Sequence, residues 1–125
     1  MLMVRLGALL LLCSPLSVPA FADTGSERTD VVLRGLPSLT DGAGVVAVRT
    51  RLAGDVALCT GRLRLRVVDL AADRVVVDRS RQVAQVRRFR VRLDAGRHRV
   101  VGTYETGDRD PCAVSRDVRR VRVRD

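Results

Sequence analysis

Three stretches of the chain alternate arginine with an apolar residue, and this alternation constrains the fold more than any other feature. The stretches are Arg62–Val67, Arg88–Leu93 and Arg120–Arg124. A period of two places successive side chains on opposite faces of a β-strand. Each stretch therefore predicts a strand with a Leu, Val or Phe face to bury and an arginine face in water. No segment of useful length shows helical periodicity, so we expect an all-β protein.

Turns rich in Gly and Asp divide the rest of the chain into further short strands. About seven antiparallel strands at this spacing predict a β-sandwich. The expected strands are Val31–Arg34, Val45–Leu52, Arg62–Val68, Arg74–Asp78, Gln82–Leu93, Arg97–Glu105 and Val118–Arg124. The apolar phase of the fifth strand changes between Val86 and Phe89, which predicts a bulge or a break near Arg87-Arg88.

The N-terminal segment has the features of a cleaved signal peptide. Arg5 supplies the positive charge, Leu6–Leu12 is the apolar run, and Ala20–Ala22 is a small-x-small cleavage site, with cleavage expected after Ala22. The apolar run is too short to span a bilayer, and we expect no transmembrane segment. The expected division is a signal peptide at 1–22, a flexible polar tail at 23–30 and one folded domain at 31–125. A secreted or envelope-associated location follows.

Removal of the signal peptide leaves two cysteines, Cys59 and Cys112. An even pair in an exported protein predicts a disulfide bond. The bond would close a long loop and contribute about 4 kcal/mol to stability in the chain-entropy model. The sequence offers no second cysteine pair or nearby histidine for zinc, and no C-x-x-C motif for redox chemistry. We therefore expect no metal site and no cofactor.

Two segments carry motifs of a known family. Thr60–Leu65 (TGRLRL) is similar to the T-G-x-V-x-F opening of a third strand, and Leu93–Asp108 (LDAGRHRVVGTYETGD) to the motif L-x-A-G-x-H-x-V-x-A-x-Y-x-G-D. In these motifs the chain resembles bacterial immunoglobulin-like repeat domains. The resemblance implies an immunoglobulin-like β-sandwich that acts as an extracellular interaction or structural module. It implies no shared catalytic residues, and we expect no enzymatic activity.

The formal net charge of +9 comes entirely from arginine, because the chain contains no lysine. Asn and Ile are also absent, which is typical of a high-GC genome, so part of the arginine content follows codon usage. In an immunoglobulin-like order the third, sixth and seventh strands share a sheet, and their arginines would lie side by side. The candidate basic face consists of Arg62, Arg64, Arg66, Arg97, Arg99, Arg120, Arg122 and Arg124.

Two interpretations of this face are open. It binds a partner protein or an envelope polyanion, such as teichoic acid, anionic lipid, a sulfated glycan or nucleic acid. The scarcity of aromatic residues, at 2% of the chain, disfavours specific nucleic-acid recognition. Alternatively, it is a solvated face enriched by codon usage. In that case it is partly neutralised by the nearby acidic residues Asp69, Asp73, Asp78, Asp94 and Asp117.

Four further residues could have a chemical role. His98 is the only histidine, and no neighbouring nucleophile or carboxylate supports a catalytic role, so a structural role is expected. Asp108 and Asp110 hint at calcium, but the intervening Arg109 and the lack of further ligands favour a solvated turn. Tyr104 makes either a corner hydrogen bond or ordinary packing contacts, and both roles are structural.

Overall fold

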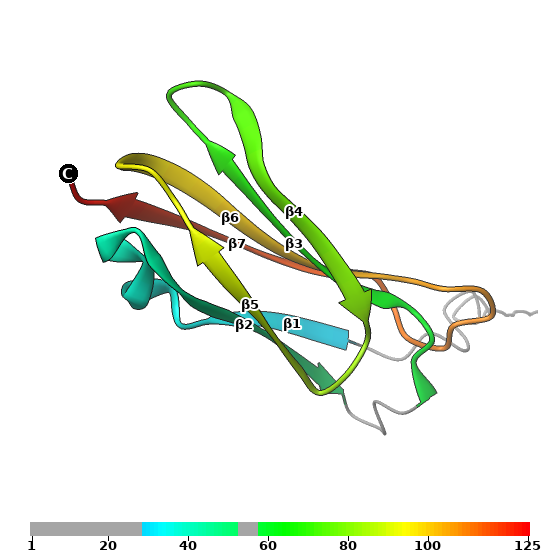
Figure 1. The fold of residues 1–125 in the computed structure, drawn as a ribbon. Coiled ribbons are helices and arrows are strands. Elements are labelled where there is room, and N and C mark those ends of the chain that lie inside the picture. The colour runs from blue at the N-terminus through cyan, green and yellow to red at the C-terminus, as the bar shows by residue number, and fades with distance from the viewer. Residues whose placement is uncertain (1–28, 53–57) are drawn as a thin grey trace, which may run out of the picture.

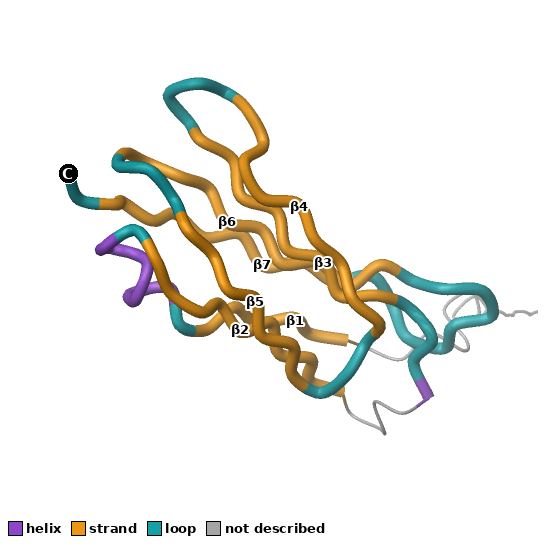
Figure 2. Tube along the Cα trace, viewed as in Figure 1, coloured by secondary structure: helices purple, strands orange, loops and turns teal. Residues whose placement is uncertain are grey.

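The alternating segments form strands in the structure, a computed structural model that describes residues 29–52 and 58–125. Within these ranges seven strands form two sheets, and every strand pair is antiparallel (Figure 1). The strands are β1 (Thr29–Arg34), β2 (Ala43–Leu52), β3 (Arg62–Asp69), β4 (Arg74–Gln82), β5 (Val86–Arg92), β6 (Gly96–Glu105) and β7 (Ser115–Val123). Strands dominate the trace (Figure 2), and the all-β prediction is confirmed.

The two sheets enclose a core built from the inward positions of the alternating segments. The sheets have the orders β1-β2-β5 and β4-β3-β6-β7, so the third, sixth and seventh strands share a sheet as predicted. Leu63, Leu65 and Val67 on β3 are fully buried, as are Val46 and Val48 on β2. Each such side chain contributes roughly 1.5–3 kcal/mol when it leaves water, which fixes the face that each strand turns inward.

The expected fifth strand differs from the observed one. Residues up to Gln82 belong to β4, at the edge of the four-stranded sheet, and β5 begins at Val86 in the other sheet. The β2–β5 pairing is regular throughout, so there is no bulge at Arg87-Arg88; of the two expected alternatives the chain has a break, and it lies earlier, at residues 83–85. The apolar phase does not change, because Val86 lies on the outer face with the β5 arginines, opposite Arg49. The β3–β4 pairing does carry an irregularity, between residues 67 and 68.

A short 3₁₀ helix, η3 (Leu36–Asp41), lies between β1 and β2 where the sequence indicated only strand ends and a turn. Leu39 on this helix is fully buried. Gly35 and Gly42 flank it with positive φ angles of 84° and 94°. A side chain at Gly35 would also place its Cβ 2.5 Å from a backbone oxygen, so glycine is required there.

The first strand begins at Thr29, inside the segment expected to be a tail. The proposed signal peptide at 1–22 and its cleavage site lie outside the described residues. In the part of the chain that the structure describes, no helix is long and apolar enough to cross a membrane.

Side chains join the two sheets where β1 faces β7. The backbone N–H of Val31 donates to Ser115 Oγ at 3.0 Å, and that of Leu33 donates to Asp117 Oδ2 at 2.9 Å. These N–H groups belong to the edge of β1, which has no neighbouring strand in its own sheet. Inward oxygen atoms of β7 therefore satisfy the donors of this open edge.

Candidate functional site

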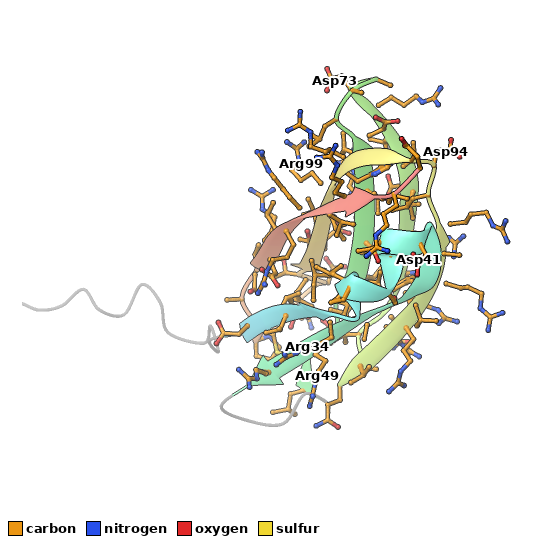
Figure 3. The ribbon with its side chains drawn as sticks, turned by 90° about the vertical axis from the view of Figure 1, so that its left-hand side faces the viewer. Arg34, Asp41, Arg49, Asp73, Asp94 and Arg99 are labelled. Atoms are coloured by element: carbon orange, nitrogen blue, oxygen red, sulfur yellow. A yellow bond between two sulfur atoms is a disulfide. The ribbon has the colours of Figure 1, made fainter. Side chains whose placement is uncertain are left out.

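The outer face of the four-stranded sheet carries the arginine rows of β3, β6 and β7. Cross-strand register places Arg97 opposite Arg122 and Arg99 opposite Arg120. The third row of arginines lies on β3, which pairs with the edge of β6 that faces away from β7. Figure 3 shows Arg99 on this side of the molecule, away from Arg34 on the other sheet. The sheet order thus brings rows that are distant in sequence onto one face.

The β3 half of this face is partly neutralised. Arg64 contacts Asp78 Oδ2 at 2.7 Å and Glu105 Oε2 at 3.1 Å, and Arg66 lies 3.8 Å from Asp78. Arg62 bonds to Ser80. The hydrogen bond from Arg64 lowers the pKa of Asp78, and the hydrogen bonds to Asp78 and Glu105 raise the pKa of Arg64. Exposed pairs of this kind add little stability, but they reduce the charge available to a ligand.

The β6–β7 half is different, because its outward-facing arginines form no ion pair with any residue that the structure describes. We call the four that lie opposite each other the arginine cluster: Arg97, Arg99, Arg120 and Arg122. Arg116 of β7 is exposed on the same face, opposite Thr103. Like charges directly opposite each other destabilise a sheet, and the cluster holds two such pairs. A hollow of about 180 Å³ lies among them and is lined by Leu70, Arg97, Arg120, Val121 and Arg122.

Of the acidic residues expected to neutralise the face, Asp78 is the one with an ion pair to a face arginine. Asp117 pairs instead with Arg119 at 3.0 Å, and Asp69 accepts the amides of a turn. The eighth candidate, Arg124, follows β7 and lies 4.0 Å from Asp41 on η3. The structure therefore brings the candidates of β3, β6 and β7 onto one surface. Among the described residues, Arg62 and the arginine cluster have no carboxylate partner there.

A shallow groove of about 610 Å³ crosses this face. Four valines contribute to its lining, and two of them, Val101 and Val118, lie opposite each other on β6 and β7. Val68 lies opposite Arg99 on the neighbouring strand pair. The groove thus extends from Arg64 and Arg66 of the β3 half to Arg99 of the arginine cluster, and an anion on the cluster would border apolar side chains.

Tyr104 holds the loop between β6 and β7 against the start of β3. Its buried hydroxyl accepts the N–H of Gly61 at 2.9 Å and donates to Asp110 Oδ2. Asp110 also accepts the N–H of Gly107 at 3.0 Å and of Cys112 at 2.9 Å. The hydroxyl therefore makes hydrogen bonds, but its partners are Gly61 and Asp110 and not the backbone a few residues upstream, as a tyrosine corner requires. The solvated-turn interpretation is wrong for Asp110, because both of its oxygens accept hydrogen bonds within the fold.

This network shifts the pKa values of both side chains. Burial raises the pKa of Tyr104 to about 12, and the hydrogen bond to Asp110 adds to the effect. Burial acts to raise the pKa of Asp110, but hydrogen bonds from Tyr104, Gly107 and Cys112 outweigh it and hold that pKa below its usual value. The fold therefore favours neutral Tyr104 beside ionised Asp110.

Stability should consequently fall at both ends of the pH range. The Asp110 contribution is complete above its unfolded pKa of about 3.9 and is lost as the pH falls further. The Tyr104 contribution is complete below about pH 10 and is lost between about pH 10 and 12. Urea unfolding at a series of pH values measures the loss of stability at low pH and at high pH, which we call the acid limb and the alkaline limb. The chain has one tyrosine and no lysine, so Tyr104→Phe should remove the alkaline limb, and its persistence would contradict the assignment.

Cys59 and Cys112 form the predicted disulfide, with their Cα atoms 5.5 Å apart. Asp110 and these two cysteines are the one group of potential metal ligands found among the described residues. The disulfide occupies both sulfur atoms, so the group does not offer a thiolate site. His98 is 1% exposed on the inward face of β6, and no described residue bonds to its Nδ1. Its burial in the core agrees with a structural role.

Comparison with known proteins assigns no family to the chain. No protein-family model matches it, and no curated protein matches it in sequence. The surface that its fold sets apart chemically is the outer face of the β4-β3-β6-β7 sheet, with the arginine cluster at one end.

Proposed function

We propose that the protein is an exported, non-enzymatic immunoglobulin-like domain that acts as an extracellular or envelope-associated interaction module. The strand order supports the fold, because the first, second and fifth strands share one sheet and the third, sixth and seventh share the other. The fourth strand pairs with the third rather than with the first. The disulfide and the signal-like N-terminal sequence support export.

The second candidate function is polyanion binding, and the arginine cluster is the observation that favours it. Four guanidinium groups without described carboxylate partners lie together although their mutual repulsion destabilises the sheet. A bound polyanion relieves this repulsion and releases its counterions, so binding weakens steeply with salt. Teichoic acid, anionic lipid and sulfated glycan share this chemistry.

Retention of the protein on immobilised heparin, with elution by a salt gradient, tests the cluster. The cluster variant carries Arg97→Gln, Arg99→Gln, Arg120→Gln and Arg122→Gln. The matched control removes the same charge from exposed positions elsewhere: Arg34→Gln, Arg49→Gln, Arg51→Gln and Arg109→Gln. Each lost contact should reduce the slope of log affinity against log salt by about one, so the cluster variant should lose up to about four.

The control variant should retain most of the wild-type salt dependence. Equal losses in the two variants would show that net charge alone causes retention. Elution of the wild-type protein below about 0.2 M salt, no later than an unrelated protein of equal charge, would also remove the polyanion hypothesis. Either result would leave the solvated-face interpretation in place.

A further inference from the structure

The edge of β5 that faces away from β2 has no strand beside it. The N–H of Leu93, just after β5, donates to the carbonyl of Gly42, just before β2, at 2.6 Å. Hydrogen-bonding direction alternates along an antiparallel strand, so the backbone groups of Arg88, Arg90 and Arg92 point away from β2. Three consecutive outward positions of this strand therefore present their N–H and C=O groups at an open edge.

Arginine side chains of β4 reach across to this edge. Arg79 Nη1 donates to the carbonyl of Arg90 at 2.9 Å, and Arg81 Nη1 donates to that of Arg88 at 3.4 Å. Both arginines occupy core-side positions of β4, since they lie opposite buried leucines of β3. They are nevertheless exposed, because β4 is itself an edge strand.

The backbone groups at the two open edges of the three-stranded sheet find opposite kinds of hydrogen-bond partner. On the β1 side, oxygen atoms of Ser115 and Asp117 accept the edge N–H groups. On the β5 side, arginine donors satisfy carbonyls, but no described residue supplies an acceptor for the N–H of Arg88 or Arg90. Two hollows of about 500 and 680 Å³ lie along this edge. The edge is therefore rich in donors and short of acceptors.

We propose that an extended, acidic segment of a partner protein binds here as an added strand on β5. Its carbonyls would accept the N–H groups of Arg88 and Arg90, as in other cases of strand addition. Carboxylates at alternate positions would lie beside the outward arginines of β5. Arg79 and Arg81 would release the carbonyls of Arg90 and Arg88, which would then accept N–H groups of the added strand.

Charge distinguishes this partner from a second copy of the chain. A β5 strand from another copy would place its own arginines against Arg88, Arg90 and Arg92, and like charges opposite each other are unfavourable. An acidic strand reverses the sign of each of these contacts. The proposed site lies between the edges of β5 and β4, whereas the arginine cluster lies on β6 and β7, so the site does not depend on polyanion binding there.

The test uses a fluorescent peptide of the length of β5, 7 residues, in which glutamate alternates with valine. Arg90→Pro removes one outward N–H without removing a bond to β2, whereas Arg90→Ala removes the charge and keeps the N–H. Fluorescence anisotropy should show about tenfold weaker binding to the proline variant than to the alanine variant. In the wild-type protein the peptide should slow hydrogen exchange at the amides of Arg88 and Arg90.

A peptide methylated on its pairing-side backbone nitrogens provides a second measurement that requires no protein variant. It should bind at least about tenfold more weakly than the unmodified peptide. Equal binding of the two peptides, or exchange protection on β6 and β7 instead of β5, would overturn the proposal. So would self-association of the wild-type protein through this edge. Loss of heparin retention in the cluster variant, with peptide binding unchanged, would show that peptide and polyanion bind at two different surfaces.

Discussion

Replacing Cys59 and Cys112 with alanine is expected to lower the free energy of unfolding by about 4 kcal/mol. The bond joins residues separated by 53 positions, so its loss releases a large loop-closure entropy in the unfolded chain. It connects the segment before β3 to the segment between β6 and β7. Urea denaturation of the variant and of the oxidised wild-type protein measures the difference.

The reduced wild-type protein is the matched control for this prediction. It should unfold near the urea concentration of the double-alanine variant, because both lack the cross-link. A loss below about 1 kcal/mol would show that the unfolded chain is already constrained near these residues. Mass spectrometry of the oxidised protein should find no free thiol at either position, and two free thiols would contradict the disulfide itself.

Tyr104→Phe is expected to cost about 3 kcal/mol although it removes a single oxygen atom. The hydroxyl is both the acceptor for the buried N–H of Gly61 and a donor to ionised Asp110. Its removal leaves the N–H without an acceptor and takes one hydrogen bond from a half-buried carboxylate. The ring itself is retained, so apolar burial changes little. Thermal and urea unfolding give the loss.

A double-mutant cycle with Asp110→Asn separates the two halves of this effect. If the Tyr104–Asp110 bond carries much of the stability, the double variant should lose clearly less than the sum of the single losses. Thr60→Ala serves as a control, because Thr60 makes an exposed hydrogen bond to the same loop at 3.2 Å. Its loss should be under about 1 kcal/mol. Additive losses in the cycle would contradict a coupled pair.

The alternation of apolar and arginine residues was sufficient to assign faces correctly over most of the sheet. The inward residues Leu63, Leu65 and Val67 are buried, and so are Val121 and Val123 at the end of the chain. The phase of a strand depends only on its own residues, and burial of apolar side chains selects one face. The assignment failed at Val86, where two strands of different sheets follow each other closely, because residues 82–93 were expected to form one strand with a change of phase.

The role of Asp110 was not predictable from its local sequence. The polar neighbours Asp108 and Arg109 resemble a solvated turn, and only the fold brings Tyr104 and the amide of Cys112 to the Asp110 carboxylate. The available signal was a carboxylate that follows a strand-end tyrosine by a few residues and lies beside a half-cystine. A tyrosine corner was considered for Tyr104, but the sequence does not identify which residue accepts its proton.

By itself, the sequence determined the all-β class, the faces of most strands and the pairing of Cys59 with Cys112. Each of these depends on local periodicity or on simple counting. Tertiary structure decided which arginine charges are compensated by a nearby carboxylate. Arg64 is compensated because β4 and β6 bring Asp78 and Glu105 beside it, whereas Arg99 and Arg120 face each other. These neighbours are set by strand register between distant segments, and electrostatic compensation requires contacts of a few ångströms that no local pattern records.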